Sequence, residues 1–225
     1  MASTKRPSAR TRLNRERVLQ AAVAFADEHG IGSLSMRKLG DALGVEAMSL
    51  YNHVANKTEL LDCMIDLVFS EIELPTMEGS WQASMRLRAI SIRQVLSRRR
   101  WAIGLMETRT SPGPATLRHQ EAVLACLRNA GFSLQMAARA SSVLDSYIYG
   151  FALQEAALPF RTAEETDDIS RALLEQMPPD KFPRLTELTL EHILQPTYDP
   201  DGEYEFGLDL ILNSLERSRE APGRV

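Results

Sequence analysis

The chain has 225 residues, of which 44% are hydrophobic and 25% are charged, a composition typical of a soluble globular protein with one or two domains. Two cysteines, Cys63 and Cys126, lie too far apart to indicate a metal knuckle or a disulfide framework. No uncharged stretch approaches the roughly 18 residues of a membrane span, so we expect a cytoplasmic protein that does not enter the membrane.

Positive charge is concentrated in the first quarter of the chain, although the net charge is −4. Residues 1–60 hold nine Lys or Arg against six Asp or Glu, and the remainder holds 17 against 24. Six of the nine lie near the N-terminus: Lys5, Arg6, Arg10, Arg12, Arg15 and Arg17. Such a cluster favours a polyanionic partner through counterion release. We expect residues 1–11 to form a flexible basic arm, and a solubilising tail stays open as the alternative for residues 1–9.

The first predicted helix runs from Arg12 to His29, because its apolar residues recur at helical spacing and Gly30 follows as a stop. Its apolar stripe consists of Val18, Ala22, Phe25 and Ala26. Ser35 is a suitable N-cap for the next helix.

The spacing of apolar residues in residues 35–57 predicts a helix-turn-helix. Leu39 and Leu43 are four residues apart, Leu50 and Val54 repeat that spacing, and Gly44 falls between the two pairs. Two short helices around such a turn form the commonest DNA-reading unit, whose second helix enters the major groove. We therefore assign residues 12–56 to a DNA-binding domain. An ordinary solvated helix pair has the same periodicity and stays open on periodicity alone.

The second helix of this pair, from Glu46 to His53, is the expected reading helix. Its outward side chains are short, polar or aromatic, with no acidic residue after Glu46. They are Ala47, Met48, Ser49, Tyr51, Asn52 and His53. Such a face suits phosphates and base edges.

A connecting helix is predicted over residues 57–75. Asn56 and Glu59 form a capping-box pattern, and Pro75 should end the helix. Residues 76–225 then show further helical periods and no strand alternation. We therefore expect an all-α chain, with an N-terminal helix-turn-helix domain and a C-terminal helical region.

The C-terminal region contains four further local signals. The run Arg98, Arg99, Arg100 lies near a helix end, where cations complement the helix dipole, so we interpret it as a solvated end rather than a second DNA site. Ser133 should cap a largely buried helix that runs to Leu158. A further capping box is predicted at Thr162 and Glu165, and another helix over residues 184–194.

Residues 12–73 resemble the DNA-binding domain of the tetracycline-repressor (TetR) family. The resemblance rests on the segment SMRKLGDALGVEAMSLYNHVANK and on the helix that begins KTELLD. Later segments are similar to the ligand-binding core of the tetracycline repressors: GSWQ at residues 79–82, AGFS at 130–133 and FGLDLILNSLE at 206–216.

The resemblance implies specific DNA contacts. Arg37 matches a position that contacts a base or the backbone, and Lys57 matches a phosphate-contacting lysine. The reading-helix positions fall on Ala47, Met48, Ser49, Tyr51, Asn52 and His53. Gly40 stands where such motifs carry alanine, which predicts a softer helix by about 1 kcal/mol.

The resemblance also implies a homeodomain-like three-helix class for the N-terminal domain, and a C-terminal helical bundle over residues 76–225 that binds a ligand and dimerises. The protein would be a ligand-responsive repressor that binds a palindromic operator as a homodimer. The dimer would be joined through residues 133–158 and 203–218, as in a four-helix bundle. A small-molecule effector would enter a pocket among the fifth, seventh and eighth helices and release the DNA. The candidate contacts are Arg88, Ile92, Trp101, Met106, Val123, Tyr147, Phe151 and Gln154.

The effector is expected to differ from tetracycline. The family's metal-binding histidine has no counterpart in residues 105–107, and Gln154 stands where its helping carboxylate belongs. We therefore expect no metal ligands and no cofactor.

The two alternatives to a DNA-binding regulator are an enzyme and a helical protein-interaction module. An enzyme is disfavoured because His29, His53, His119 and His192 are scattered and no nucleophile or phosphate-loop motif occurs. A helical protein-interaction module that binds no operator is the other alternative, and the basic arm argues against it.

Overall fold

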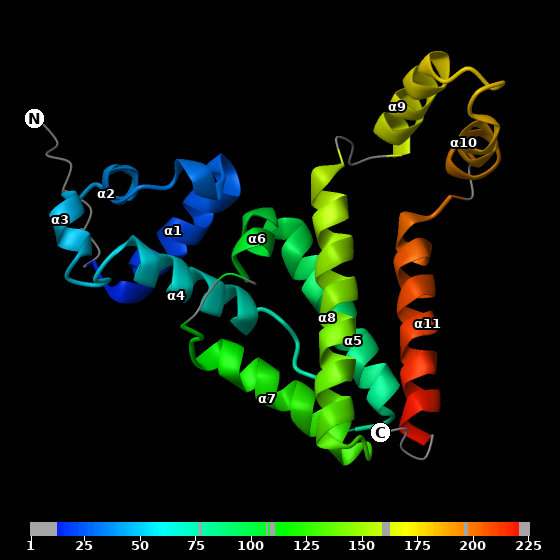
Figure 1. The fold of residues 1–225 in the computed structure, drawn as a ribbon. Helices are drawn as coiled ribbons and strands as arrows, with labels where there is room; N and C mark the ends of the chain where they lie inside the picture. The colour runs from blue at the N-terminus through cyan, green and yellow to red at the C-terminus, as the bar shows by residue number, and fades with distance from the viewer. Residues whose placement is uncertain are drawn as a thin grey trace, which may run out of the picture. The chain divides into compact units, whose positions relative to one another are not determined.

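The computed structural model describes residues 13–76, 78–106, 108, 111–158, 163–195 and 198–220. These residues are helical or loop, without a strand, which confirms the all-α prediction (Figure 1). The chain divides into two compact units, Met1–Cys126 and Leu127–Val225, and each is described by itself. The predicted basic arm lies outside the described residues. Among these residues no helix is long and apolar enough to span a membrane.

The first unit alternates longer helices with short ones. Its elements are α1 Arg15–His29, η1 Ile31–Ser33, α2 Met36–Leu43, α3 Ala47–Leu50, α4 Lys57–Ser70, α5 Trp81–Arg98, η2 Arg100–Ala102, α6 Ile103–Met106 and α7 Pro114–Asn129, whose last turn falls beyond the division.

Side-chain caps start several of these helices. Ser35 Oγ accepts the N–H of Lys38 at 3.2 Å, which confirms the predicted cap of α2. Asn56 Oδ1 accepts the N–H of Glu59 at 2.9 Å and starts α4. The Glu59 carboxylate reaches back to the N–H of Ala55, one residue before the cap. The first helix starts at Arg15 rather than Arg12, because Asn14 Oδ1 caps it at the N–H of Arg17.

Helices α1 to α4 share one apolar core. Its members are almost fully buried: Val18, Ala22, Ala26, Leu34, Leu39, Leu50, Val54, Leu60 and Met64. Burial of each leucine or valine side chain contributes about 1.5–3 kcal/mol, so this core fixes the helix-turn-helix against α1 and α4.

The connecting helix α4 is shorter than the sequence predicts. It ends at Ser70, because the N–H of Glu71 bonds Val68 O and the N–H of Ile72 bonds Phe69 O, and these tight bonds close the last turn. The N–H of Glu73 then donates to Ser91 Oγ of α5 at 2.9 Å. The prediction that the helix extends to Pro75 is therefore wrong.

The second unit contains two long helices and a shorter group. Its elements are α8 Leu134–Ala157, α9 Ala163–Gln176, α10 Pro183–Leu188, the π-helical turn η3 Thr189–Ile193 and α11 Pro200–Glu220. Ser133 Oγ caps α8 at the N–H of Met136, as predicted. The single helix expected over residues 184–194 is instead α10 followed by η3. The Thr162 of the predicted capping box lies outside the described residues.

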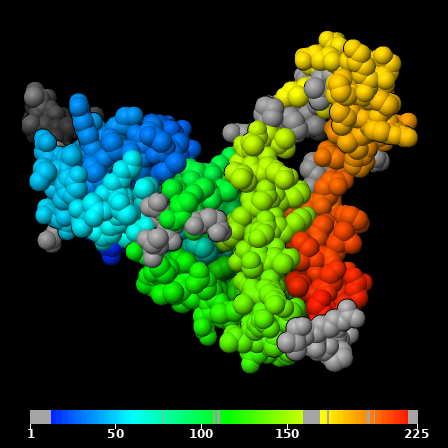
Figure 2. Space-filling view, viewed as in Figure 1, coloured from blue at the N-terminus to red at the C-terminus, as the bar shows by residue number. Residues whose placement is uncertain are grey.

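Helices α8 and α11 lie side by side (Figures 1 and 2). Tyr147 Oη donates to Tyr204 O at 2.8 Å, and the two rings stack. Helix α8 buries one stripe of small and branched residues, namely Ala137, Ala140, Leu144, Ile148 and Ala152. The expectation that α8 is largely buried is wrong for the single chain, because Leu153 is 57% exposed and Val143 is also exposed.

Candidate nucleic-acid interface and effector region

The turn between α2 and α3 depends on two glycines. Gly44 has a φ of 67° and ψ of 35°, the left-handed conformation that ends helices at little cost only with glycine. The N–H of Val45 then donates to Gly40 O at 3.0 Å. A Cβ at Gly40 would lie 2.9 Å from Val45 O and 3.2 Å from Ala47 N. Gly40 therefore permits the close approach of α2 to the start of α3.

Helix α3 is one turn long, from Ala47 to Leu50, so the predicted extent to His53 is wrong. The N–H groups of His53 and Val54 both donate to Leu50 O, at 2.9 and 3.1 Å. These bonds fold residues 51–53 into a turn and return Val54 to the core. Leu50 thus anchors the reading segment, and the residues around it project from the domain.

The predicted reading residues form an outward face of α3 and its following turn. Met48 is 74% exposed, Tyr51 and Asn52 are exposed, and Ala47, Ser49 and His53 are half-buried. Arg37 is exposed on α2. Tyrosine and arginine can donate to phosphate, asparagine and histidine can bond base edges, and methionine can contact a thymine methyl. The arrangement thus offers both positioning and reading groups on one segment.

Two basic side chains of this domain are held by the protein. Lys57 Nζ donates to Leu34 O at 2.7 Å, which ties the start of α4 to the segment before α2. Arg15 Nη2 pairs with Glu59 Oε1 at 2.9 Å and also contacts Cys63 Sγ at 3.1 Å. Arg15 is therefore part of the α1–α4 joint rather than of a free arm. A lysine ammonium has three donors, so Lys57 keeps donors for a phosphate.

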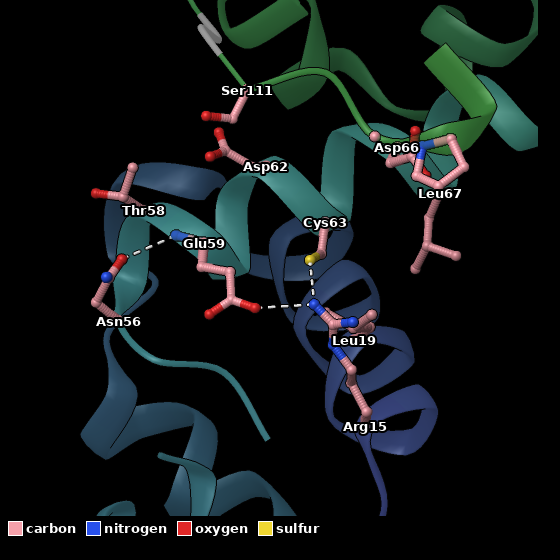
Figure 3. A pocket seen from close by; sticks show the side chains of 12 residues that line it. Arg15, Leu19, Asn56, Thr58, Glu59, Asp62, Cys63, Asp66, Leu67 and Ser111 are labelled. Carbon is pink, nitrogen blue, oxygen red and sulfur yellow. Dashed lines mark hydrogen bonds and ion pairs between the residues drawn. The ribbon is translucent and has the colours of Figure 1, made fainter. Parts of the chain in front are cut away.

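A pocket of about 820 Å³ lies in the first unit beside this joint (Figure 3). Its lining comes from α1, α4 and the segment before α7: Arg15, Leu19, Asn56, Thr58, Glu59, Asp62, Cys63, Asp66, Leu67, Ser111, Gly113 and Pro114. Figure 3 shows Asn56, Glu59 and Arg15 engaged with protein partners. Burial raises the pKa of the Cys63 thiol, against the opposing charge of Arg15. None of the eight predicted effector contacts lines this pocket.

Five of the predicted effector contacts lie in the first unit. Arg88 and Ile92 on α5 and Val123 on α7 are almost fully buried, and Trp101 and Met106 are half-buried. Arg88 Nε donates to His119 Nε2 at 3.1 Å, and the His119 ring lies against Phe69 of α4. Burial, and secondarily the charge of Arg88, lower the pKa of His119 to about 3, so this imidazole is a neutral acceptor.

The other three predicted effector contacts lie on α8 in the second unit. Tyr147 and Phe151 are half-buried in an aromatic cluster with Tyr204, and Gln154 is exposed. Among the described side chains no three His, Cys, Asp or Glu gather in an arrangement that suits a metal ion.

Sequence reasoning missed a charged cluster around Asp27. Trp101, predicted as an effector contact, directs its indole N–H to Asp27 Oδ1 at 2.7 Å and packs against the helix-turn-helix core. Arg99 pairs with Asp27 of α1 and with Glu71, at 2.9 Å from Nη2 to Oε1. Arg99 is thus not the solvated helix end that the sequence indicated. These partners are 28 to 74 residues apart, and no local pattern could have found them.

Residues 18–64 match the family model of bacterial regulatory proteins of the tetR family, and residues 74–219 match that of the tetracyclin repressor-like C-terminal domain. An HTH-type transcriptional regulator of Saccharopolyspora erythraea is 38% identical over 139 residues, which cover 61% of this chain and 59% of that protein. The tetracycline repressor protein class D of Escherichia coli is 33% identical over 91% of this chain and 90% of its own.

Among solved structures, the chain is similar to the Streptomyces coelicolor TetR family protein ActR in complex with actinorhodin. The two share 28% sequence identity and a TM-score of 0.77, over 94% of this chain and 100% of that one.

Proposed function

Because the chain belongs to the TetR family of bacterial regulators, a family of non-enzymatic DNA-binding proteins, we propose that it is a repressor released from its operator by a small-molecule effector. It acts as a homodimer on a palindromic site, in the cytoplasm where the chromosome lies. In this proposal residues 12–56 read DNA, and residues 76–225 bind the effector and dimerise. Residues 57–75 connect these two regions.

The outward face of α3 and its following turn carries the DNA-binding proposal. Leu50 is fully buried and fixes the segment, while Met48, Tyr51 and Asn52 project into solvent. The exposed Met48 and Tyr51 side chains leave apolar surface open to solvent, and a major groove offers thymine methyls and phosphates to both. Lys57 and Arg37 supply positive charge close to this segment in the sequence.

Exposed apolar residues on α8 and α11 support the homodimer. Leu153 and Val143 on α8, and Phe206 and Leu210 on α11, are each about half or more exposed. Two copies that pair through these faces bury them in a bundle of four helices. A two-fold dimer presents two reading segments to one face of DNA, with half-sites about 34–36 Å apart or a multiple of that.

The effector proposed here is an organic molecule other than tetracycline. The ActR structure shows that a similar fold holds actinorhodin, whereas the class D relative is named for tetracycline. This chain has no histidine in residues 105–107 and has Gln154 on α8. The eight candidate contacts named from the sequence remain predictions.

Selection of duplexes from a random DNA library by the purified protein tests the proposal. Enrichment of an inverted repeat, with one protein dimer bound per repeat by sedimentation, is the expected result. Recovery of no sequence above background contradicts operator binding and favours the helical interaction module instead. Release of the selected duplex by members of a library of drug-like organic compounds, with minocycline as the tetracycline probe, then tests the effector class. Release by minocycline contradicts an effector other than tetracycline.

A further inference from the structure

Arg99 joins two carboxylates that come from distant parts of the first unit. Its guanidinium pairs with Asp27 in the last turn of α1 and with Glu71 just after α4, where Nε and Nη2 lie 3.3 and 2.9 Å from Oε1. The side chains of Arg99, Asp27 and Glu71 are only 24%, 26% and 32% exposed. A partly buried, multidentate arginine pair has more geometric specificity than an isolated surface pair.

The backbone holds Arg99 at a corner. Its N–H donates to Val95 O at 2.9 Å and ends α5, and its carbonyl accepts the N–H of Ala102 at 2.8 Å and starts η2. Trp101 of η2 adds a second bond to Asp27. The corner between α5 and η2 is thus attached to α1, and α1 in turn belongs to the core that fixes α3.

We infer that Arg99 is a positioning residue that sets how the helix-turn-helix is held on the rest of the first unit, and that it does not contact DNA. This inference rests on the proposed function. A guanidinium placed on two carboxylates has its charge compensated and releases few counterions from a phosphate. Its neighbour Arg98 is exposed, and among the described residues the pairs with Asp27 and Glu71 belong to Arg99, so the two arginines differ in role although they are adjacent.

The consequence concerns operator spacing. In a two-fold dimer, the distance between the two reading segments decides which half-site spacing fits. When Arg99 pairs with Asp27 and Glu71, the helix-turn-helix keeps one position and the two reading segments stay at one distance. When these pairs are lost, the helix-turn-helix samples several positions and the distance varies. Loss of Arg99 therefore broadens the accepted spacing without removing a phosphate contact.

The test uses the full-length protein and the inverted repeat selected above, with its spacer lengthened or shortened by one and two base pairs. The variants are Arg99→Gln, Asp27→Asn, the double variant, and Arg98→Gln as the matched control. We expect Arg99→Gln to reduce the discrimination between spacers by about two- to thirtyfold, which corresponds to the usual coupling energies of about 0.5–2 kcal/mol. The salt dependence of binding stays at the wild-type slope. The double variant should behave like Arg99→Gln alone, because Arg99→Gln already removes the pairs with Asp27 and Glu71, and Asp27→Asn keeps an amide oxygen for the indole N–H of Trp101.

Two outcomes overturn the inference. A slope of log affinity against log salt that falls by about 0.9 in Arg99→Gln, with spacer discrimination kept, makes Arg99 a phosphate contact. Equal effects of Arg98→Gln and Arg99→Gln make the arginine run a general basic patch. Thermal unfolding of each variant separates these results from simple loss of folded protein. A wild-type protein that selects no duplex contradicts the proposed function itself, which is a distinct result from a spacing preference that Arg99→Gln leaves intact.

Discussion

Asp66 of α4 caps the N-terminal end of α7 from outside the helix: its Oδ1 accepts the N–H of Thr116 at 2.8 Å and the Thr116 hydroxyl at 3.0 Å. A carboxylate at this place satisfies an N–H that lacks an intrahelical partner and complements the helix dipole. The contact links the connecting helix to α7 directly.

We expect Asp66→Ala to lower the free energy of unfolding by about 1–2 kcal/mol, because the N–H of Thr116 loses its acceptor. Urea denaturation followed by circular dichroism measures this change. Thr116→Val is the matched control, since it removes the hydroxyl bond and keeps the N–H bond. An Asp66→Ala protein no less stable than Thr116→Val would contradict the capping role.

Gly40 should resist replacement by alanine although it lies within a helix. Helix propensity alone favours Gly40→Ala by about 1 kcal/mol. The new Cβ would however meet the backbone at Val45 O and Ala47 N, which cannot move without displacing α3. We expect Gly40→Ala to be less stable than the wild type by chemical denaturation. Ala42→Gly, on the exposed side of the same helix, provides the ordinary propensity loss for comparison. A stabilised Gly40→Ala protein would show that the turn is looser than described.

His119 should make the protein acid-sensitive. Its folded pKa is about 3 against 6.5 for an ordinary histidine, so the unfolded chain binds the extra proton between these values. The stabilisation due to neutral His119 is complete above about pH 6.5 and is lost progressively as the pH falls toward about 3. We expect His119→Gln, which keeps an acceptor near Arg88 but does not titrate, to flatten the fall in unfolding free energy over this range. Urea titrations at several pH values measure it, and unchanged pH profiles would contradict the assignment.

Phe206→Asp should disrupt the proposed dimer. Phe206 is 65% exposed on α11, and a carboxylate there would be buried without a partner if two copies pair through this face. We expect sedimentation equilibrium to show monomer at concentrations where the wild type is dimeric. Leu117→Asp, at an exposed leucine of α7, is the control that should stay dimeric. If both variants remained dimeric, the dimer interface would not include the face of α11 that carries Phe206.

Local signals allowed much of the fold to be predicted. The caps at Ser35, Asn56 and Ser133 are formed by residues three positions apart, and the buried residues Leu39, Leu50 and Val54 recur at helical spacing. Both kinds of signal are contained within a few residues of sequence. The all-α class and the helix-turn-helix follow from them.

The ends of α3 and α4 and the tertiary contacts could not be predicted in this way, whereas Gly30 correctly marked the end of α1 at His29. The end of α3 depends on two N–H groups that share Leu50 O, and the end of α4 depends on the bonds of Glu71 and Ile72 to carbonyls three residues earlier. Beyond that end, Ser91 from another helix accepts the N–H of Glu73. The partners Asp27 and Arg99 are 72 residues apart, and no periodicity relates them. The sequence predicted too much burial for α8, because an apolar helix face has the same pattern whether it packs against the same chain or against a second copy. The predicted effector contacts stay predictions for a related reason, since lining a pocket and filling a core need the same residue types.

The most direct test of DNA reading compares Asn52→Ala with Lys57→Ala in gel-shift titrations on the selected operator and on a scrambled duplex, at several salt concentrations. We expect Asn52→Ala to lose about 1–3 kcal/mol on the operator and little on the scrambled duplex, because Asn52 reads a base edge. Lys57→Ala should weaken both duplexes alike and reduce the salt slope by about 1. Lys57→Ala also removes the bond from Lys57 to Leu34 O. Thermal unfolding of this variant therefore measures the lost stability separately from the lost affinity for DNA. Equal losses on both duplexes for Asn52→Ala would contradict the assignment of α3 and its turn as the reader of the operator.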